Sequence, residues 1–227
     1  MIRGMYSAAS AMLSQLVKQE VHTHNLANAN TTGFKRYVPH LTPDGSGPAQ
    51  PGIVASPDLS PGGLHTTDAP LDVALCSDGF FVVDDGNARH YTRNGHFTLD
   101  SGGMLVNSQG HRVLGQQGPI HIQGSRVEIA ADGAIHCDGE FVDKFLVVDF
   151  PAQTQAGLEA NTGVIGSRAP AQVASYGVIQ GAIEESNVNS ITEMAAITSG
   201  YRVYEANARV ISKIDDSLSK LIQASTG

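Results

Sequence analysis

The sequence predicts a mainly β central domain, an antiparallel sandwich or barrel, flanked by N- and C-terminal α-helices that can form a coiled coil or helical bundle. Three observations support this fold class. All ten prolines lie between Pro39 and Pro170, and 21 of the 25 glycines lie between Gly45 and Gly181. Both ends of the 227-residue chain carry apolar residues at helical spacing. The middle instead contains short β-branched and aromatic runs separated by turn dipeptides.

Residues 1–38 form the predicted N-terminal helical arm. Met5, Ala9, Met12 and Leu16 follow one another at steps of three and four, which is typical of one helix face. The register then becomes polar before Leu26, and Gly33 provides a stop signal after an asparagine-rich run. We therefore expect a helix with a short apolar stripe in this arm.

Residues 183–227 form the predicted C-terminal helical arm. Its apolar spacing indicates a heptad seam with one polar interruption, at Met194, Ile197, Tyr201, Tyr204, Ala208, Ile211, Asp215, Leu218 and Ile222. Ser190 with Glu193 predicts a capping box at the helix start. A helix from Ser190 to Gln223 would be about 50 Å long at ~1.5 Å per residue. Such a helix needs a partner to cover its stripe.

Two segments lie between the arms. Residues 39–70 contain seven prolines and predict an extended connector rich in proline and glycine. Residues 71–182 predict the β-rich central domain. Its expected strands are Leu71–Leu75, Phe80–Val83, His90–Arg93, His96–Leu99, Met104–Val106, Arg112–Leu114, Ile120–Ile122, Arg126–Ile129, Ala134–Cys137 and Phe141–Phe150. The sequence Arg93-Asn94-Gly95-His96 predicts a hairpin with a type I′ turn, because Asn-Gly suits positive φ.

Charge and hydropathy exclude several kinds of partner. The net charge is −8, with +3 on residues 1–38, −9 on residues 39–182 and −2 on residues 183–227. An acidic chain is a poor candidate for nucleic-acid binding through phosphate neutralisation. No apolar run approaches the ~18–20 residues needed to span a bilayer, so we expect no direct membrane insertion. Residues 1–18 lack the apolar core of a cleavable signal peptide.

The residues expected of an enzyme or a metal site do not appear in a recognisable pattern. The sequence contains no nucleophile elbow, P-loop, dinucleotide-binding fingerprint, zinc-protease motif or EF-hand loop. His22 and His24 are two residues apart, so on a helix they would face different directions and would not share one ion. Cys76 and Cys137 do not form a CxxC motif and could pair or stay free. We therefore expect no catalytic, cofactor-binding or metal site.

The apolar stripes of the two arms allow two interpretations. The arms could pack on each other or on the central domain inside one monomer, which spacing alone favours. Alternatively, helices from several copies could bundle together, which the position of the arms at opposite chain ends and the length of the seams favour. Gly200 within the seam would permit close backbone approach or would weaken the helix.

Both ends of the chain resemble one family. Residues 24–35, His-Asn-Leu-Ala-Asn-Ala-Asn-Thr-Thr-Gly-Phe-Lys, resemble the N-terminal signature of the bacterial flagellar rod and hook family. Residues 181–189, together with Met194 and residues 204–207, resemble its C-terminal signature. Residues 70–75, 78–83 and 91–95 look like the basal-body rod members. Residues 110–115, 118–120 and 129–133 look most like the proximal-rod member.

The resemblance implies a structural subunit of the proximal basal-body rod and no enzymatic activity. Such a subunit assembles helically with itself and with inner-rod and distal-rod subunits, transmits torque and encloses the export channel. It is exported without a cleavable signal peptide by the flagellar type III apparatus and resides in the rod, in the periplasmic space. The alternatives are a distal-rod or hook-type axial protein, or a metal-dependent cell-wall hydrolase, which would need clustered metal ligands.

The stripes and signatures together define the expected assembly interface. We expect the terminal arms to be partly disordered in a free monomer and to fold against neighbouring subunits, with Asn25, Asn28, Asn187 and Asn207 fixing the register between them. The candidate interface residues are Met5, Ala9, Met12, Leu16, Asn25, Leu26, Asn28, Gly33, Phe34, Asn187, Met194, Ile197, Tyr201, Tyr204, Asn207, Ala208, Ile211 and Leu218.

Overall fold

The chain divides into two compact units that alternate along the sequence. The computed structural model describes residues 2–42, 52–150, 159–161, 164–166, 171–173 and 175–226. One unit, the helical unit, comprises residues 1–27, 37–55 and 189–227. The other, the β unit, comprises residues 28–36 and 56–188.

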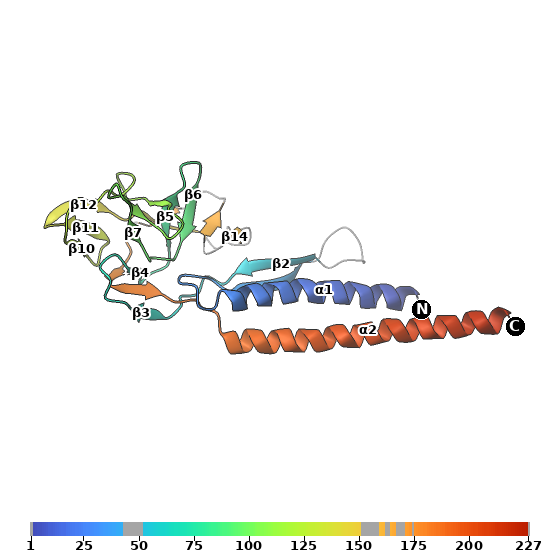
Figure 1. The fold of residues 1–227 in the computed structure, drawn as a ribbon. Coiled ribbons are helices and arrows are strands. Elements are labelled where there is room, and N and C mark those ends of the chain that lie inside the picture. Colours follow the sequence, from blue (N-terminus) through green and yellow to red (C-terminus); the bar gives the residue numbers. More distant parts are fainter. Residues whose placement is uncertain are drawn as a thin grey trace. The chain divides into compact units, whose positions relative to one another are not determined.

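The helical unit contains two long helices that lie side by side and run antiparallel (Figure 1). Helix α1 spans Ile2–Ala27 and helix α2 spans Ser190–Thr226. With 26 and 37 residues they are about 39 and 56 Å long at ~1.5 Å per residue. Strands β1 (Tyr37–Thr42) and β2 (Gly52–Pro57) form a two-stranded sheet. Among the described residues, no helix combines the length and the apolar character needed to cross a membrane.

The β unit is built from short antiparallel strands. They are β3 (Leu64–Thr66), β4 (Val73–Leu75), β5 (Phe80–Asp84), β6 (Arg89–Thr92), β7 (Thr98–Leu99), β8 (Leu105–Val106), β9 (Arg112–Val113), β10 (Val127–Ile129), β11 (Ala134–Cys137), β12 (Glu140–Lys144), β13 (Val147–Asp149), β14 (Glu159–Asn161), β15 (Val164–Gly166), β16 (Ala171–Gln172), β17 (Val178–Gln180) and β18 (Ala182–Glu184). The largest sheet follows the order β14-β15-β6-β5-β9-β8-β7, with β13 also paired to β5 and β16. Strands β10, β11 and β12 form a second sheet, while β17 pairs with β4 and β18 with β3.

Strand β5 lies at the centre of the hydrophobic core. Phe81 and Val83 enter one buried cluster, and Phe80 and Val82 enter another. Because successive strand residues point to opposite faces, both faces of β5 are covered. The Phe81 ring makes edge contacts with Phe97 and with a second core phenylalanine, each at 5.3 Å between centroids. The prediction of a mainly antiparallel β middle between two helices is confirmed, and the described strands do not close a barrel.

The predicted hairpin at residues 93–96 is wrong. Strand β6 pairs with β5 and β15, whereas β7 pairs with β8, so β6 and β7 do not form a hairpin. Neither Asn94 nor Gly95 has a positive φ. Gly95 instead accepts a 3.0 Å hydrogen bond from the Val73 amide, and a Cβ at this position would overlap the Val73 carbonyl. This glycine therefore serves a close approach between segments and not a type I′ turn.

Two predicted strands and the predicted helix cap also differ from the structure. The run 141–150 breaks into β12 and β13, and the run 120–122 contributes only an isolated bridge at His121. Helix α2 is capped by Asn189, whose Oδ1 accepts from the Ile191 and Thr192 amides at 3.0 and 3.2 Å. Ser190 is therefore the first helical residue and not the cap of a capping box.

Candidate functional site

Helices α1 and α2 pack against each other along the helical unit. Three of their facing pairs are Gly4 with Ile214, Gln15 with Gly200, and His22 with Glu193. His22 Nδ1 lies 2.6 Å from Glu193 Oε2, and the Glu193 side chain is buried. A Cβ at Gly200 would overlap the Gln15 amide, so glycine allows the close approach anticipated from the sequence. Glu193 thus joins the two helices and does not close a capping box.

The apolar stripe of α1 points away from this contact. We define the outer face of α1 as the surface formed by its exposed apolar residues Met5, Ala9, Leu13, Leu16 and Val17. Successive residues of a helix are rotated by about 100°. The centre of the outer face therefore lies roughly 100° or more around α1 from the row of Gly4, Gln15 and His22, which meets α2. Leu13 is 54% exposed and Leu16 is 43% exposed. Pairing with α2 therefore leaves the outer face exposed, whereas Met12 of the predicted stripe is half-buried.

The predicted seam of α2 is only partly covered. Its half-buried members are Ile197, Tyr204, Ala208 and Ile211, and Asn207, a further candidate interface residue, is also half-buried. Met194 and Tyr201 are each 55% exposed. The seam is therefore not one continuous contact within a single chain. The side-chain environment of Leu218 lies outside the described residues.

Several residues of the N-terminal signature make contacts within their own chain. Asn25 is completely buried in the helical unit, where its Nδ2 donates to the Tyr37 carbonyl and its Oδ1 accepts from the Tyr37 amide, both at 2.8 Å. Met12 and Leu26 are half-buried. In the β unit, Asn28 Oδ1 accepts from the Thr31 hydroxyl at 3.2 Å.

Two further members of that signature are buried in the β unit. Gly33 has a φ of 68°, and a Cβ there would overlap the backbone of Asn94. Phe34 is fully buried. Only glycine fits the first position without strain. Asn25, Gly33 and Phe34, expected at an interface between subunits, are therefore covered by their own chain.

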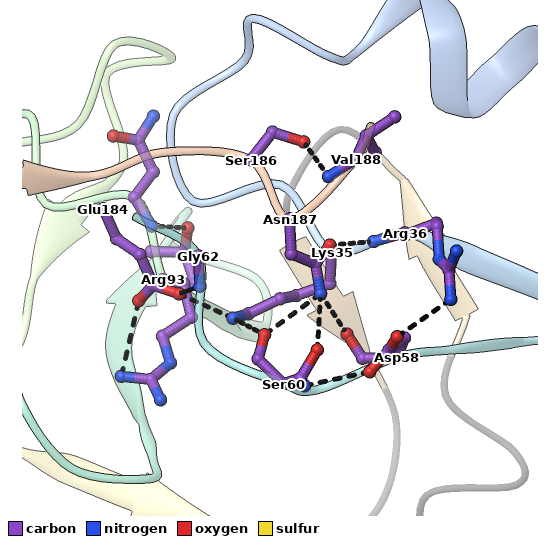
Figure 2. Close-up of polar contacts among 12 residues, drawn as sticks. Lys35, Arg36, Asp58, Ser60, Gly62, Arg93, Glu184, Ser186, Asn187 and Val188 are labelled. Atoms are coloured by element: carbon purple, nitrogen blue, oxygen red, sulfur yellow. Dashed lines mark hydrogen bonds and ion pairs between the residues drawn. The ribbon is translucent and has the colours of Figure 1, made fainter. Parts of the chain in front are cut away.

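A buried polar network joins the two signature segments within the β unit (Figure 2). Glu184 is 2% exposed, and its Oε1 accepts from Lys35 Nζ at 2.6 Å and from the Gly62 amide at 2.9 Å. Arg93 Nη1 lies 3.6 Å from the other carboxylate oxygen, Oε2. Burial lowers the pKa of Lys35, although the hydrogen bond to Glu184 opposes this shift.

Asn187 continues this network beside Glu184 (Figure 2). Its Oδ1 accepts from the Arg36 amide at 2.7 Å, and its Nδ2 donates to the Asp58 and Ser60 carbonyls at 2.9 and 3.0 Å. Burial would raise the pKa of Asp58, but hydrogen bonds from Ser60 and the Arg36 guanidinium lower it overall. Asn187 therefore acts as a structural connector within one chain. Sequence reasoning missed Lys35, Arg93 and Glu184, because the partners are up to 149 residues apart.

The site contains no recognisable catalytic chemistry. Within the described parts of the chain, no group of three or more His, Cys, Asp or Glu side chains could hold a metal ion. Cys76 is exposed and Cys137 is buried, and both are free thiols. What the geometry provides is an uncovered apolar helix face and a rigid polar junction. An exposed apolar helix face of this kind is typical of a structural protein that contacts other chains.

Comparisons with known proteins identify the family. Three family models match: "Flagella basal body rod protein" at residues 5–35, "Flagellar hook protein FlgE/F/G D1 domain" at 74–137, and "Flagellar basal body rod FlgEFG protein C-terminal" at 179–224. The flagellar basal-body rod protein FlgF of Escherichia coli is 34% identical, over 98% of each chain. FlgF of Salmonella typhimurium is 33% identical over 96% of each chain, and the rod protein FlgG of Bacillus subtilis is 26% identical over 98% of each. The chain belongs to the flagellar basal-body rod protein family.

Proposed function

We propose that this chain, a structural subunit of the bacterial flagellar basal-body rod, joins its neighbours through the outer face of α1. The observation that carries the proposal is that this face remains exposed after α1 and α2 have paired. Burying the rest of one half-exposed leucine contributes about 1 kcal/mol, so several such residues give a useful contact energy. Exposed Met194 and Tyr201 on α2 provide a second apolar surface for the same purpose.

The finer assignment is a proximal position in the rod. Relatives named FlgF are 28–34% identical, whereas relatives named FlgG are 26–29% identical. This difference supports a subunit that contacts inner-rod and distal-rod proteins, transmits torque, encloses the export channel and passes through the type III export apparatus into the periplasmic space. Relatives at this identity carry names of structural rod proteins, which does not favour the hydrolase alternative.

The test places a charge on the outer face of α1. Leu16→Asp should reduce incorporation into purified basal bodies at least tenfold and abolish motility, because assembly would bury an unpaired carboxylate. Ser7→Asp is the matched control, since Ser7 is exposed on α1 and lies away from both the outer face and the row formed by Gly4, Gln15 and His22. Both variants should keep the helical circular dichroism of the parent. Normal incorporation of the Leu16→Asp protein would refute the proposed interface.

Cross-linking would test the proximal position separately. Photoreactive residues at Leu13 of α1 and at Tyr201 of α2, on the two proposed contact surfaces, should between them capture both inner-rod and distal-rod subunits in assembled basal bodies. Capture of hook subunits alone would place the chain elsewhere in the structure.

A further inference from the structure

Residues 176–188, which we name the closing segment, connect many separate parts of the β unit. Strand β17 pairs with β4 and strand β18 pairs with β3, so the segment completes two sheets that begin near residue 64. Val178 and Ala182 are buried, and the Tyr176 hydroxyl donates to the Phe145 carbonyl. The Gln180 side chain accepts from the Ile129 amide and donates to the Pro70 and Val127 carbonyls.

The same segment supplies the partners of the N-terminal signature. The Gly33 amide donates to the Glu184 carbonyl at 2.7 Å, and the Lys35 ammonium donates to the Glu184 carboxylate (Figure 2). Lys35 is only 5% exposed. A buried ammonium without a nearby carboxylate is strongly unfavourable. Glu184 therefore stabilises the observed arrangement of residues 28–36, together with the Ser60 carbonyl, which also accepts from Lys35 Nζ at 2.7 Å.

Closure of the β unit also depends on the burial of β4. Val73, Ala74 and Leu75 are almost completely buried, and the strand hydrogen-bonded along them is β17. Val73 and Leu75 belong to the same core cluster as Val178 and Cys137. Loss of the closing segment would expose this cluster and leave main-chain groups of β4 without their sheet partner.

We propose that the closing segment is the element that shuts the β unit, with Glu184 as the group on which closure depends. When the chain is synthesised or transported N-terminus first, the β unit cannot be completed until residue 188 is available. Its core therefore stays open during most of that process, which is compatible with transport of the chain as an unfolded polypeptide. The inference stands on the contacts within the β unit and is independent of the contacts between subunits.

Thiol labelling of the full-length chain tests the proposal. Cys137 is buried in β11, whereas Cys76 is exposed, so a Cys76→Ser background leaves Cys137 as the reporter of the core. In this background Glu184→Gln should raise the labelling rate of Cys137 at least 100-fold, because Lys35 and Arg93 lose their charged partner. The matched control Glu185→Gln alters the neighbouring exposed carboxylate and should leave the rate within twofold of the parent.

A second variant separates the charge from general damage. Lys35→Met and Arg93→Met combined with Glu184→Gln remove both buried cations together with the carboxylate, and this triple variant should restore protection of Cys137 at least tenfold relative to Glu184→Gln alone. Protection of Cys137 in the Glu184→Gln protein would overturn the proposal. So would equal labelling in the Glu184→Gln and Glu185→Gln proteins, or a triple variant no better protected than Glu184→Gln.

Discussion

Replacement of Asn25 by alanine tests how α1 is fastened to β1 in the helical unit. The Asn25 side chain is 0% exposed and forms two 2.8 Å hydrogen bonds with the Tyr37 backbone. Each buried hydrogen bond contributes about 1–1.5 kcal/mol net, so losing both should lower the free energy of unfolding by about 2–3 kcal/mol. This value is a large part of the stability of a typical small domain.

Urea denaturation followed by far-ultraviolet circular dichroism provides the assay, since most helical signal comes from α1 and α2. Asn25→Ala should shift the helical transition to lower urea, while Cys137 in the β unit remains protected from thiol reagents. Asn28→Ala is the matched control, because Asn28 is only half-buried and should cost less than 1 kcal/mol. An Asn25→Ala protein with unchanged stability but no incorporation into rods would refute this reasoning and would return Asn25 to the interface between subunits.

Two further outcomes follow from the structure. Gly200→Ala should destabilise the helix pair because the new methyl group meets the Gln15 amide. Adding Gln15→Ala should restore or exceed parental stability, since alanine favours a helix by about 1 kcal/mol over glycine. A Gly200→Ala protein as stable as the parent would contradict the close approach. Burial raises the pKa of Tyr176 to about 12, so one of the six tyrosines should ionise late in a spectrophotometric titration, and Tyr176→Phe should remove that component. Because the pKa of Tyr176 is raised in the folded state, its neutral hydroxyl contributes fully to the free energy of unfolding below the ordinary tyrosine pKa near 10. This contribution is lost as pH rises toward 12.

Local sequence signals predicted which segments form helices and strands, but not how turns and caps are used. The Asn94-Gly95 dipeptide carries a hairpin signal, yet contact with Val73 determines its conformation. Similarly, Ser190 and Glu193 fit a capping box, but Asn189 caps α2 and Glu193 pairs with His22. In each case a partner distant in sequence competes successfully with the local preference.

The candidate site was only partly predictable for a related reason. The stripe on α1 follows from the 3.6-residue period, which depends on the sequence alone. Which side of α1 meets α2 depends on small and polar residues such as Gln15 and His22, whose role appears only when the facing residues are known. Asn187 and Asn25 illustrate the same limit, because an asparagine within a signature can connect subunits or can connect segments of one chain.

The sequence by itself determined the breaker-free helical ends, the strand-rich acidic middle and the family signatures, since composition, periodicity and motif spacing are properties of the linear chain. The tertiary structure alone decided that the outer face of α1 stays exposed, that Asn25 and Asn187 act within the chain, and that Lys35 meets Glu184. These outcomes depend on contacts between residues far apart in sequence, and the energy of such a contact depends on burial and geometry that no single segment specifies.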